Sequence, residues 1–139
     1  MNIAFNLNQF HNDRIFFMDT KPNSLIDGLF TKINYCDEQF TMNGLFLTFM
    51  CESTANLQKP RVESVYYRAL CDIEQELLRS YVGTKTAKFA MNCKLGEAIH
   101  AKYDIVGTKI AGKQDPVIVK ISGIWENKSG QIGLSYRIM

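Results

Sequence analysis

The fold is decided by one stretch of the chain, VESVYYRALCDIEQELLRSY at residues 62–81. Apolar residues recur in it at intervals of three and four, a spacing that aligns them along one face of an α-helix. Gly83 follows, at a place where glycine often ends a helix. The pattern predicts one long amphipathic helix over about residues 61–82. Its apolar face would hold Val62, Val65, Tyr66, Ala69, Leu70, Ile73, Leu77, Leu78 and Tyr81.

Before this helix the apolar residues alternate with polar ones, which is typical of half-buried strands. Leu29, Thr31, Ile33 and Tyr35 fall on one face of such a strand, and Phe30, Lys32 and Asn34 fall on the other. Gly44 lies in the middle of a long β-type segment, where we expect a bulge or a bend. The predicted strands lie near residues 3–7, 14–18, 29–35 and 39–51, with a loop at 19–24 and another at 52–60.

After the helix the chain returns to alternation. Residues 84–102 are ambiguous, because Ala87, Phe89 and Met91 alternate like a strand while 95–101 could form a helical turn. A strand is predicted at 103–110, then another with Val117, Val119, Ile121 and Trp125 on one face and Lys120 and Ser122 on the other. A hairpin loop at 127–130 and a final strand at 131–138 complete the chain.

The chain has strands before and after one helix, with no repeat or linker. This order predicts a single α+β domain over 1–139 that is mainly antiparallel β. Two architectures fit this order. One is a small barrel of the oligonucleotide-binding (OB) type with extra strands, which carries its helix between strand groups. The other is an open, curved sheet with the helix packed across one face.

The composition favours a folded domain, since 46% of the 139 residues are hydrophobic and 12% are aromatic. The net charge of +2 conceals an asymmetry. Residues 1–78 hold 6 basic and 10 acidic residues, whereas 79–139 hold 10 basic and 4 acidic ones. This asymmetry could give the fold a positive face that attracts polyanions, although lysines also serve to protect strand edges.

The cysteines, Cys36, Cys51, Cys71 and Cys93, are too far apart to form the close pairs of a zinc site. No secretory leader is evident and no apolar run approaches the ~20 residues of a membrane helix. We therefore expect free thiols, no bound metal, no membrane association, and an intracellular protein that is not secreted.

Catalytic motifs are not evident in the sequence. His11 and His100 lack ligands or catalytic partners at a recognisable spacing. Glu74 and Glu76 fall on different helix faces, so they do not form a carboxylate pair. We expect no cofactor and no enzymatic activity; an enzyme would need His11 or His100 to meet cysteines and carboxylates in a pocket of the fold.

Aromatic rings and dispersed cations are the more informative residues. Proteins that bind single strands stack bases on aromatic rings beside a basic groove, and each lysine that meets a phosphate releases counterions. The alternative is that these rings fill the core or a subunit interface. The candidate nucleic-acid-binding residues are Lys85, Lys88, Lys102, Lys109, Lys120, Arg137, Phe17, Tyr67, Tyr103 and Trp125.

The segments VKISGIWE at 119–126 and GLSYR at 133–137 resemble the closing hairpin of small proteins from large double-stranded DNA viruses. Some of those proteins are similar to single-stranded-DNA-binding proteins with an OB barrel. The resemblance implies that broad class and a location in the cytoplasm or nucleus of an infected host cell. The acidic tail that often ends such proteins has no counterpart here, because the chain ends in the predicted strand.

Two hypotheses of function follow. The first is a non-enzymatic module that binds nucleic acid, single-stranded DNA in preference and RNA as a second possibility, by a basic groove and aromatic stacking. The second is a viral structural, assembly or protein-interaction module that forms a homo-oligomer, which the apolar content of residues 39–51 favours.

Overall fold

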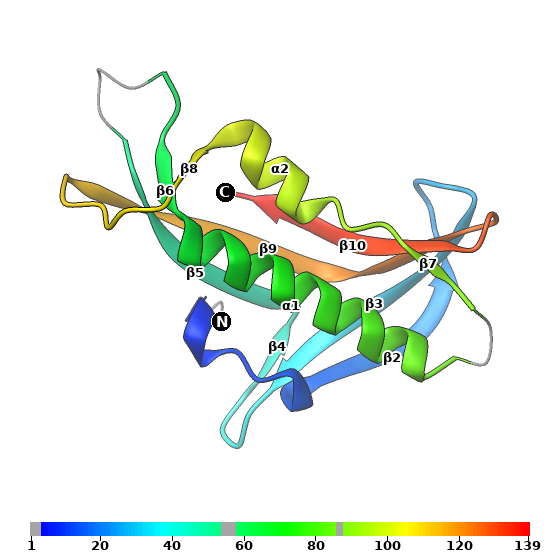
Figure 1. The fold of residues 1–139 in the computed structure, drawn as a ribbon. Helices are drawn as coiled ribbons and strands as arrows, with labels where there is room; N and C mark the ends of the chain where they lie inside the picture. The colour runs from blue at the N-terminus through cyan, green and yellow to red at the C-terminus, as the bar shows by residue number, and fades with distance from the viewer. Residues whose placement is uncertain (1–3, 54–57, 86–87) are drawn as a thin grey trace.

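The computed structural model describes residues 4–53, 58–85 and 88–139. Within these residues ten strands form one mostly antiparallel sheet, and two α-helices pack on it (Figure 1). The α+β prediction is therefore confirmed. The helices are α1 (Ser64–Gly83) and α2 (Leu95–Lys102). The strands are β1 (Phe5–Asn6), β2 (Ile15–Pro22), β3 (Gly28–Cys36), β4 (Thr41–Asn43), β5 (Leu45–Glu52), β6 (Arg61–Glu63), β7 (Ala90–Met91), β8 (Asp104–Val106), β9 (Gln114–Asn127) and β10 (Gln131–Ile138).

The long strand β9 organises the sheet. Residues 114–121 of β9 pair with β5, and residues 123–127 pair with β3 along the same edge. The opposite edge of β9 pairs with β10. In the described residues β2 pairs with β3 alone and β8 with β6 alone, so the two ends of the sheet do not meet. The predicted OB-like barrel is therefore wrong, and the sheet is the open, curved one (Figure 1).

The helix α1 lies across one face of the sheet, and α2 packs beside it on that face (Figure 1). The predicted apolar stripe supplies the contact, since its central residues are buried against strand residues such as Leu47 and Val119. The helix begins three residues later than predicted, because Arg61–Glu63 form β6 between β5 and β8. The residues that α1 buries are Leu70, Ile73, Glu74, Leu77, Leu78 and Tyr81.

Gly44 allows the chain to change partner strands. It has a φ of 97°, in the left-handed region that favours glycine, and it lies between β4 and β5. β4 pairs with β3, whereas β5 pairs with β9. The predicted bend at Gly44 is therefore confirmed, and it lets β3 and β5 share one edge of β9.

An irregularity in β9 changes which side chains face the helices. Tyr136 is opposite Ile121 and Ser135 is opposite Gly123, so Ser122 is the extra residue of a bulge. After the bulge, Ile124 and Glu126 point toward α1 and Trp125 points to the other face. The prediction that Trp125 shares a face with Val117, Val119 and Ile121 is wrong, because strict alternation takes no account of the extra residue.

Other expectations differ in detail. Leu7 belongs to a short 3₁₀ turn rather than to a strand, and β2 extends to Pro22 through the predicted loop. The predicted strand at 103–110 is reduced to β8. The ambiguous segment contains β7 and α2, while Ile3 and Ala87 lie outside the described residues.

Candidate nucleic-acid interface

The sheet face opposite α1 and α2 carries cations and aromatic rings in adjacent cross-strand rows. Directly opposite residues of neighbouring strands share a face, so the register identifies which side chains gather. We call this surface the helix-free face. It comprises Lys21, Phe30, Lys32, Phe46, Lys120, Gly123, Trp125, Gly133, Ser135 and Arg137.

The first row crosses four strands. Lys21 on β2 is opposite Phe30 on β3, and Phe30 is opposite Trp125 on β9. Trp125 is opposite Gly133 on β10. Both rings are half-buried, so part of each remains accessible. The row therefore sets one cation beside two aromatic surfaces.

The next two rows add three more cations. Lys32 is opposite Gly123, which is opposite Ser135. Phe46, Lys120 and Arg137 form the third row across β5, β9 and β10. The Lys120 ammonium lies 5.5 Å from the centre of the Phe46 ring, within the range of a cation–π contact. Phe46 is only 7% exposed, so its ring contacts Lys120 but has too little accessible surface to stack with a base.

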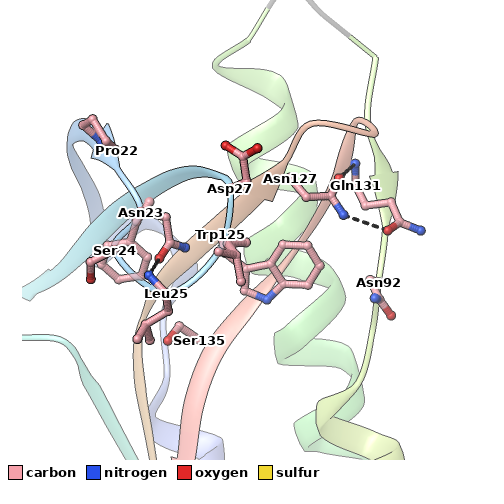
Figure 2. A pocket seen from close by; sticks show the side chains of 12 residues that line it. Pro22, Asn23, Ser24, Leu25, Asp27, Asn92, Trp125, Asn127, Gln131 and Ser135 are labelled. Carbon is pink, nitrogen blue, oxygen red and sulfur yellow. Dashed lines mark hydrogen bonds between the residues drawn. The ribbon is translucent and has the colours of Figure 1, made fainter.

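Two hollows mark this face, and Phe30 lines both of them. One, of about 470 Å³, also contains Lys21 and Lys32 together with Asp19. The other, of about 640 Å³, surrounds Trp125 under the loop that joins β2 to β3 (Figure 2). The hollow that contains Lys21 and Lys32 therefore adjoins the hollow around Trp125, and the Phe30 ring lies between them.

Three of the candidate residues predicted from sequence lie on the helix-free face, namely Lys120, Trp125 and Arg137. Phe17 and Lys85 lie on the helix-covered side, next to Tyr81 at the end of α1. The Phe17 ring packs edge-on against Tyr81 at 5.4 Å between centroids, and the Lys85 ammonium lies 5.1 Å from the same ring.

The other candidates are dispersed. The ring centroids of Tyr67 on α1 and His100 lie 6.0 Å apart. Tyr103 is only 5% exposed, so neither face of its ring is accessible to a base. Lys102 ends α2, while Lys88 and Lys109 are exposed before β7 and after β8. The ten candidate residues therefore do not line one groove, because the chain places them on both faces of the sheet and on both helices.

Lys21, Phe30 and Lys32 are not among the candidate residues predicted from the sequence. A signal for them existed, since alternation in 29–35 placed Phe30 and Lys32 on one strand face. What the sequence lacks is the pairing of β3 with the second half of β9, which brings these residues next to Trp125.

Buried polar groups lie on the helix-covered side and have structural partners. The Tyr81 hydroxyl donates to the Glu126 carboxylate and also contacts Thr31 Oγ1 at 3.1 Å. Burial, followed by this contact with Glu126, raises the pKa of Tyr81. Glu74 accepts a hydrogen bond from the Leu95 amide at the start of α2, and burial raises the pKa of Glu74.

The described residues hold no group of three or more His, Cys, Asp or Glu side chains able to bind a metal ion. All four cysteines are free thiols. His11 and His100 are both exposed, and neither lines one of the two hollows of the helix-free face. Neither of the helices in the described part of the chain is long and apolar enough to cross a membrane.

The helix-free face therefore brings four cations and two accessible rings onto one side of the sheet. No protein-family model, curated protein or solved structure matches this chain.

Proposed function

We propose that the protein binds single-stranded nucleic acid, DNA in preference to RNA, through the helix-free face and without catalysis. One observation carries the proposal: Lys21, Lys32, Lys120 and Arg137 lie on the same sheet face as the accessible rings of Phe30 and Trp125, in three adjacent rows. The three rows themselves contain no acidic residue; Asp19 lines the hollow that also contains Lys21 and Lys32.

The mechanism has two parts. The four cations neutralise backbone phosphates and release counterions, which makes binding depend steeply on salt. Phe30 and Trp125 offer flat surfaces on which unpaired bases stack, at ~1–3 kcal/mol per base. Bases in a duplex are stacked on each other and cannot use these rings, so the face favours a single strand.

The test is fluorescence anisotropy with a labelled 12-nucleotide oligo-dT at several salt concentrations. We compare the Lys32→Ala/Lys120→Ala variant with a control that removes two lysines away from the face, Lys102→Ala/Lys109→Ala. Each phosphate contact on a single strand contributes about 0.7 to the slope of log affinity against log salt. The first variant should therefore lose about 1.4 from this slope, and the control should match the wild type.

Absence of binding at low salt would refute the proposal. Equal losses in both double variants would mean that any attraction is spread over the molecule rather than held on the helix-free face. A 12-nucleotide oligo-U of the same length measures the preference for DNA.

A second candidate is self-association through the edge strand β2. In the described residues β2 pairs only with β3, and its other edge carries no partner. Phe16 is 53% exposed and Met18 is 46% exposed in the first half of this strand, and an exposed apolar edge is a template for pairing with another copy, whereas Asp19, Lys21 and Pro22 protect the second half. Light scattering distinguishes this assembly role, since Phe16→Ser, which removes the apolar ring and adds no charge, should then dissociate the oligomer without changing oligonucleotide affinity.

A further inference from the structure

The hollow around Trp125 is large enough to hold a small planar ligand. Its volume of about 640 Å³ is in the usual range of about 300–1,000 Å³ for ligand sites. Trp125 and Phe30 form its aromatic part, and the loop at 23–27 rises beside them with Leu25 and Ile26. Figure 2 shows the Trp125 indole between this loop and the side chains of Asn92 and Gln131.

The Trp125 ring packs directly on the β10 backbone, because Gly133 has no side chain at the point of contact. A Cβ atom on Gly133 would lie 2.4 to 2.9 Å from three atoms of the indole. Only glycine at this position lets the ring rest against the β10 backbone. One side of the indole is therefore fixed on the strand, and the remaining surface of the ring lines the pocket.

Carboxamide groups surround the ring, and one of them is fixed by its neighbours. The Asn127 side-chain oxygen accepts hydrogen bonds from the backbone amides of Ser129 and Gln131, at 3.0 and 2.9 Å. The Asn127 side-chain nitrogen donates to Gln131 Oε1 at 2.9 Å, which orients the Gln131 amide (Figure 2).

Other polar groups of the pocket remain available to a ligand. The Asn92 backbone donates to the Ile132 carbonyl oxygen at 2.7 Å, which anchors this residue beside β10. Within the described residues the Asn92 carboxamide, the Ser135 hydroxyl and the Gln131 side-chain nitrogen make no hydrogen bond to protein. The pocket thus offers both donors and acceptors around an aromatic surface.

The pocket is close to neutral. Among the described residues that line it, Asp27 alone is ionisable, and the Asp27 carboxylate lies 2.8 Å from the Lys128 ammonium. The cations Lys21 and Lys32 lie in the neighbouring hollow, on the other side of Phe30. The chemistry therefore suits a flat, uncharged heterocycle with hydrogen-bonding edges, attached to an anionic group that stays outside the pocket.

We propose that this pocket takes one unstacked nucleobase of the bound strand, stacked on Trp125 with its polar edge toward Asn92 and Gln131, while its phosphates meet Lys21 and Lys32. The inference rests on the proposed function and adds to it a specific base site. Because Trp125 is the protein's single tryptophan, its fluorescence reports on this pocket alone.

The experiment compares two 12-nucleotide strands of equal charge, oligo-dT and a strand with abasic sites at every position. We expect oligo-dT to quench the Trp125 emission and the abasic strand to leave it unchanged. Trp125→Ala should weaken binding of oligo-dT by roughly 5- to 150-fold, the equivalent of ~1–3 kcal/mol for one stacked base. The abasic strand should bind that variant and the wild type equally.

Further variants separate the pocket from a general effect on folding. Trp125→Phe should recover part of the affinity, because the smaller ring still stacks. Gln131→Ala should weaken oligo-dT binding, whereas Gln39→Ala, which removes an exposed carboxamide in the turn between β3 and β4, should not.

The outcomes distinguish the two proposals. If the abasic strand and oligo-dT bind equally well, with no quenching by either, the base pocket is wrong and electrostatic binding by the face stands. If neither strand binds at low salt, the proposed function is wrong and the base pocket with it.

Discussion

Lys120 on β9 and Arg137 on β10 are directly opposite each other on the helix-free face. Like charges in this relationship destabilise a sheet. Within the described part of the chain neither side chain forms an ion pair with an acidic residue. A phosphate between the two cations would remove the repulsion, which is why this pair supports binding to a polyanion.

The pair leads to a prediction in which stability and affinity change in opposite directions. Arg137→Glu replaces a repulsive cross-strand pair with an attractive one, so the free energy of unfolding in urea should rise by ~0.2–1 kcal/mol. The affinity for oligo-dT should fall, because a cation is lost and an anion faces the strand.

Lys109→Glu is the control for Arg137→Glu. It makes the same change of charge in an exposed residue after β8. It should alter oligo-dT binding much less at physiological salt, where charges separated by more than about 8 Å are largely screened. A larger loss of affinity in the control than in Arg137→Glu would contradict the assignment of the face.

Gly133→Ala should displace the Trp125 ring without removing any charge. The new methyl group would lie within 2.4 to 2.9 Å of three indole atoms, so the ring must move. We expect a shift of the Trp125 emission maximum and weaker oligo-dT binding. Overpacking of this kind costs ~1–3 kcal/mol of stability. Gly83→Ala is the control, because nothing lies within 4 Å of a Cβ at that position.

The secondary structure could be predicted best where local periodicity and tertiary packing agree. The helix α1 and the strand β10 follow their apolar patterns closely, because each buries one face against the core. The break at Gly44 could also be predicted, since glycine alone adopts its backbone conformation at no steric cost.

The helix-free face could not be predicted in the same way. Trp125 was assigned to the wrong face because the bulge at Ser122 follows from pairing with β10, which leaves no local sign. Lys21, Lys32 and Lys120 lie far apart in the sequence, and only the register of β2, β3 and β9 brings them together. The excess of basic residues in 79–139 suggested one positive face, but the fold places these residues on both faces of the sheet.

Tyr81→Phe tests the polar contact between α1 and the sheet. The variant removes the hydroxyl that donates to Glu126 and leaves a buried carboxylate, 8% exposed, without this partner. A loss of ~1–3 kcal/mol or more in the free energy of unfolding is expected in urea. Tyr81→Phe/Glu126→Gln should recover part of it, because the double variant no longer buries the carboxyl group that loses its donor.

Oligo-dT affinity should be the same in both Tyr81 variants, since Glu126 and Tyr81 lie on the helix-covered side. A loss of affinity in folded Tyr81→Phe would mean that nucleic acid reaches that side, where Phe17 and Lys85 surround Tyr81.

Glu74 makes stability depend on pH in a predictable direction. Burial raises the pKa of this carboxyl group, an effect that the neighbouring charge of Glu97 increases and the amides of Leu95, Gly96 and Lys94 oppose. The ionised form is therefore disfavoured in the folded state. At neutral pH it costs stability, and this cost disappears as the pH falls through the raised pKa toward the ordinary value of about 4.3.

Glu74→Gln isolates this effect, because glutamine is neutral at every pH and keeps an oxygen for the Leu95 amide. The variant should be more stable than the wild type at pH 7, and the difference should shrink as the pH is lowered through that window. Urea denaturation between pH 7 and pH 4 measures it. Glu76→Gln, in an exposed residue of α1, controls for the loss of one negative charge. A stability difference that stays constant over this range would show that the carboxyl group titrates alike in the folded and unfolded chains, and that its hydrogen bonds to α2 fully offset burial.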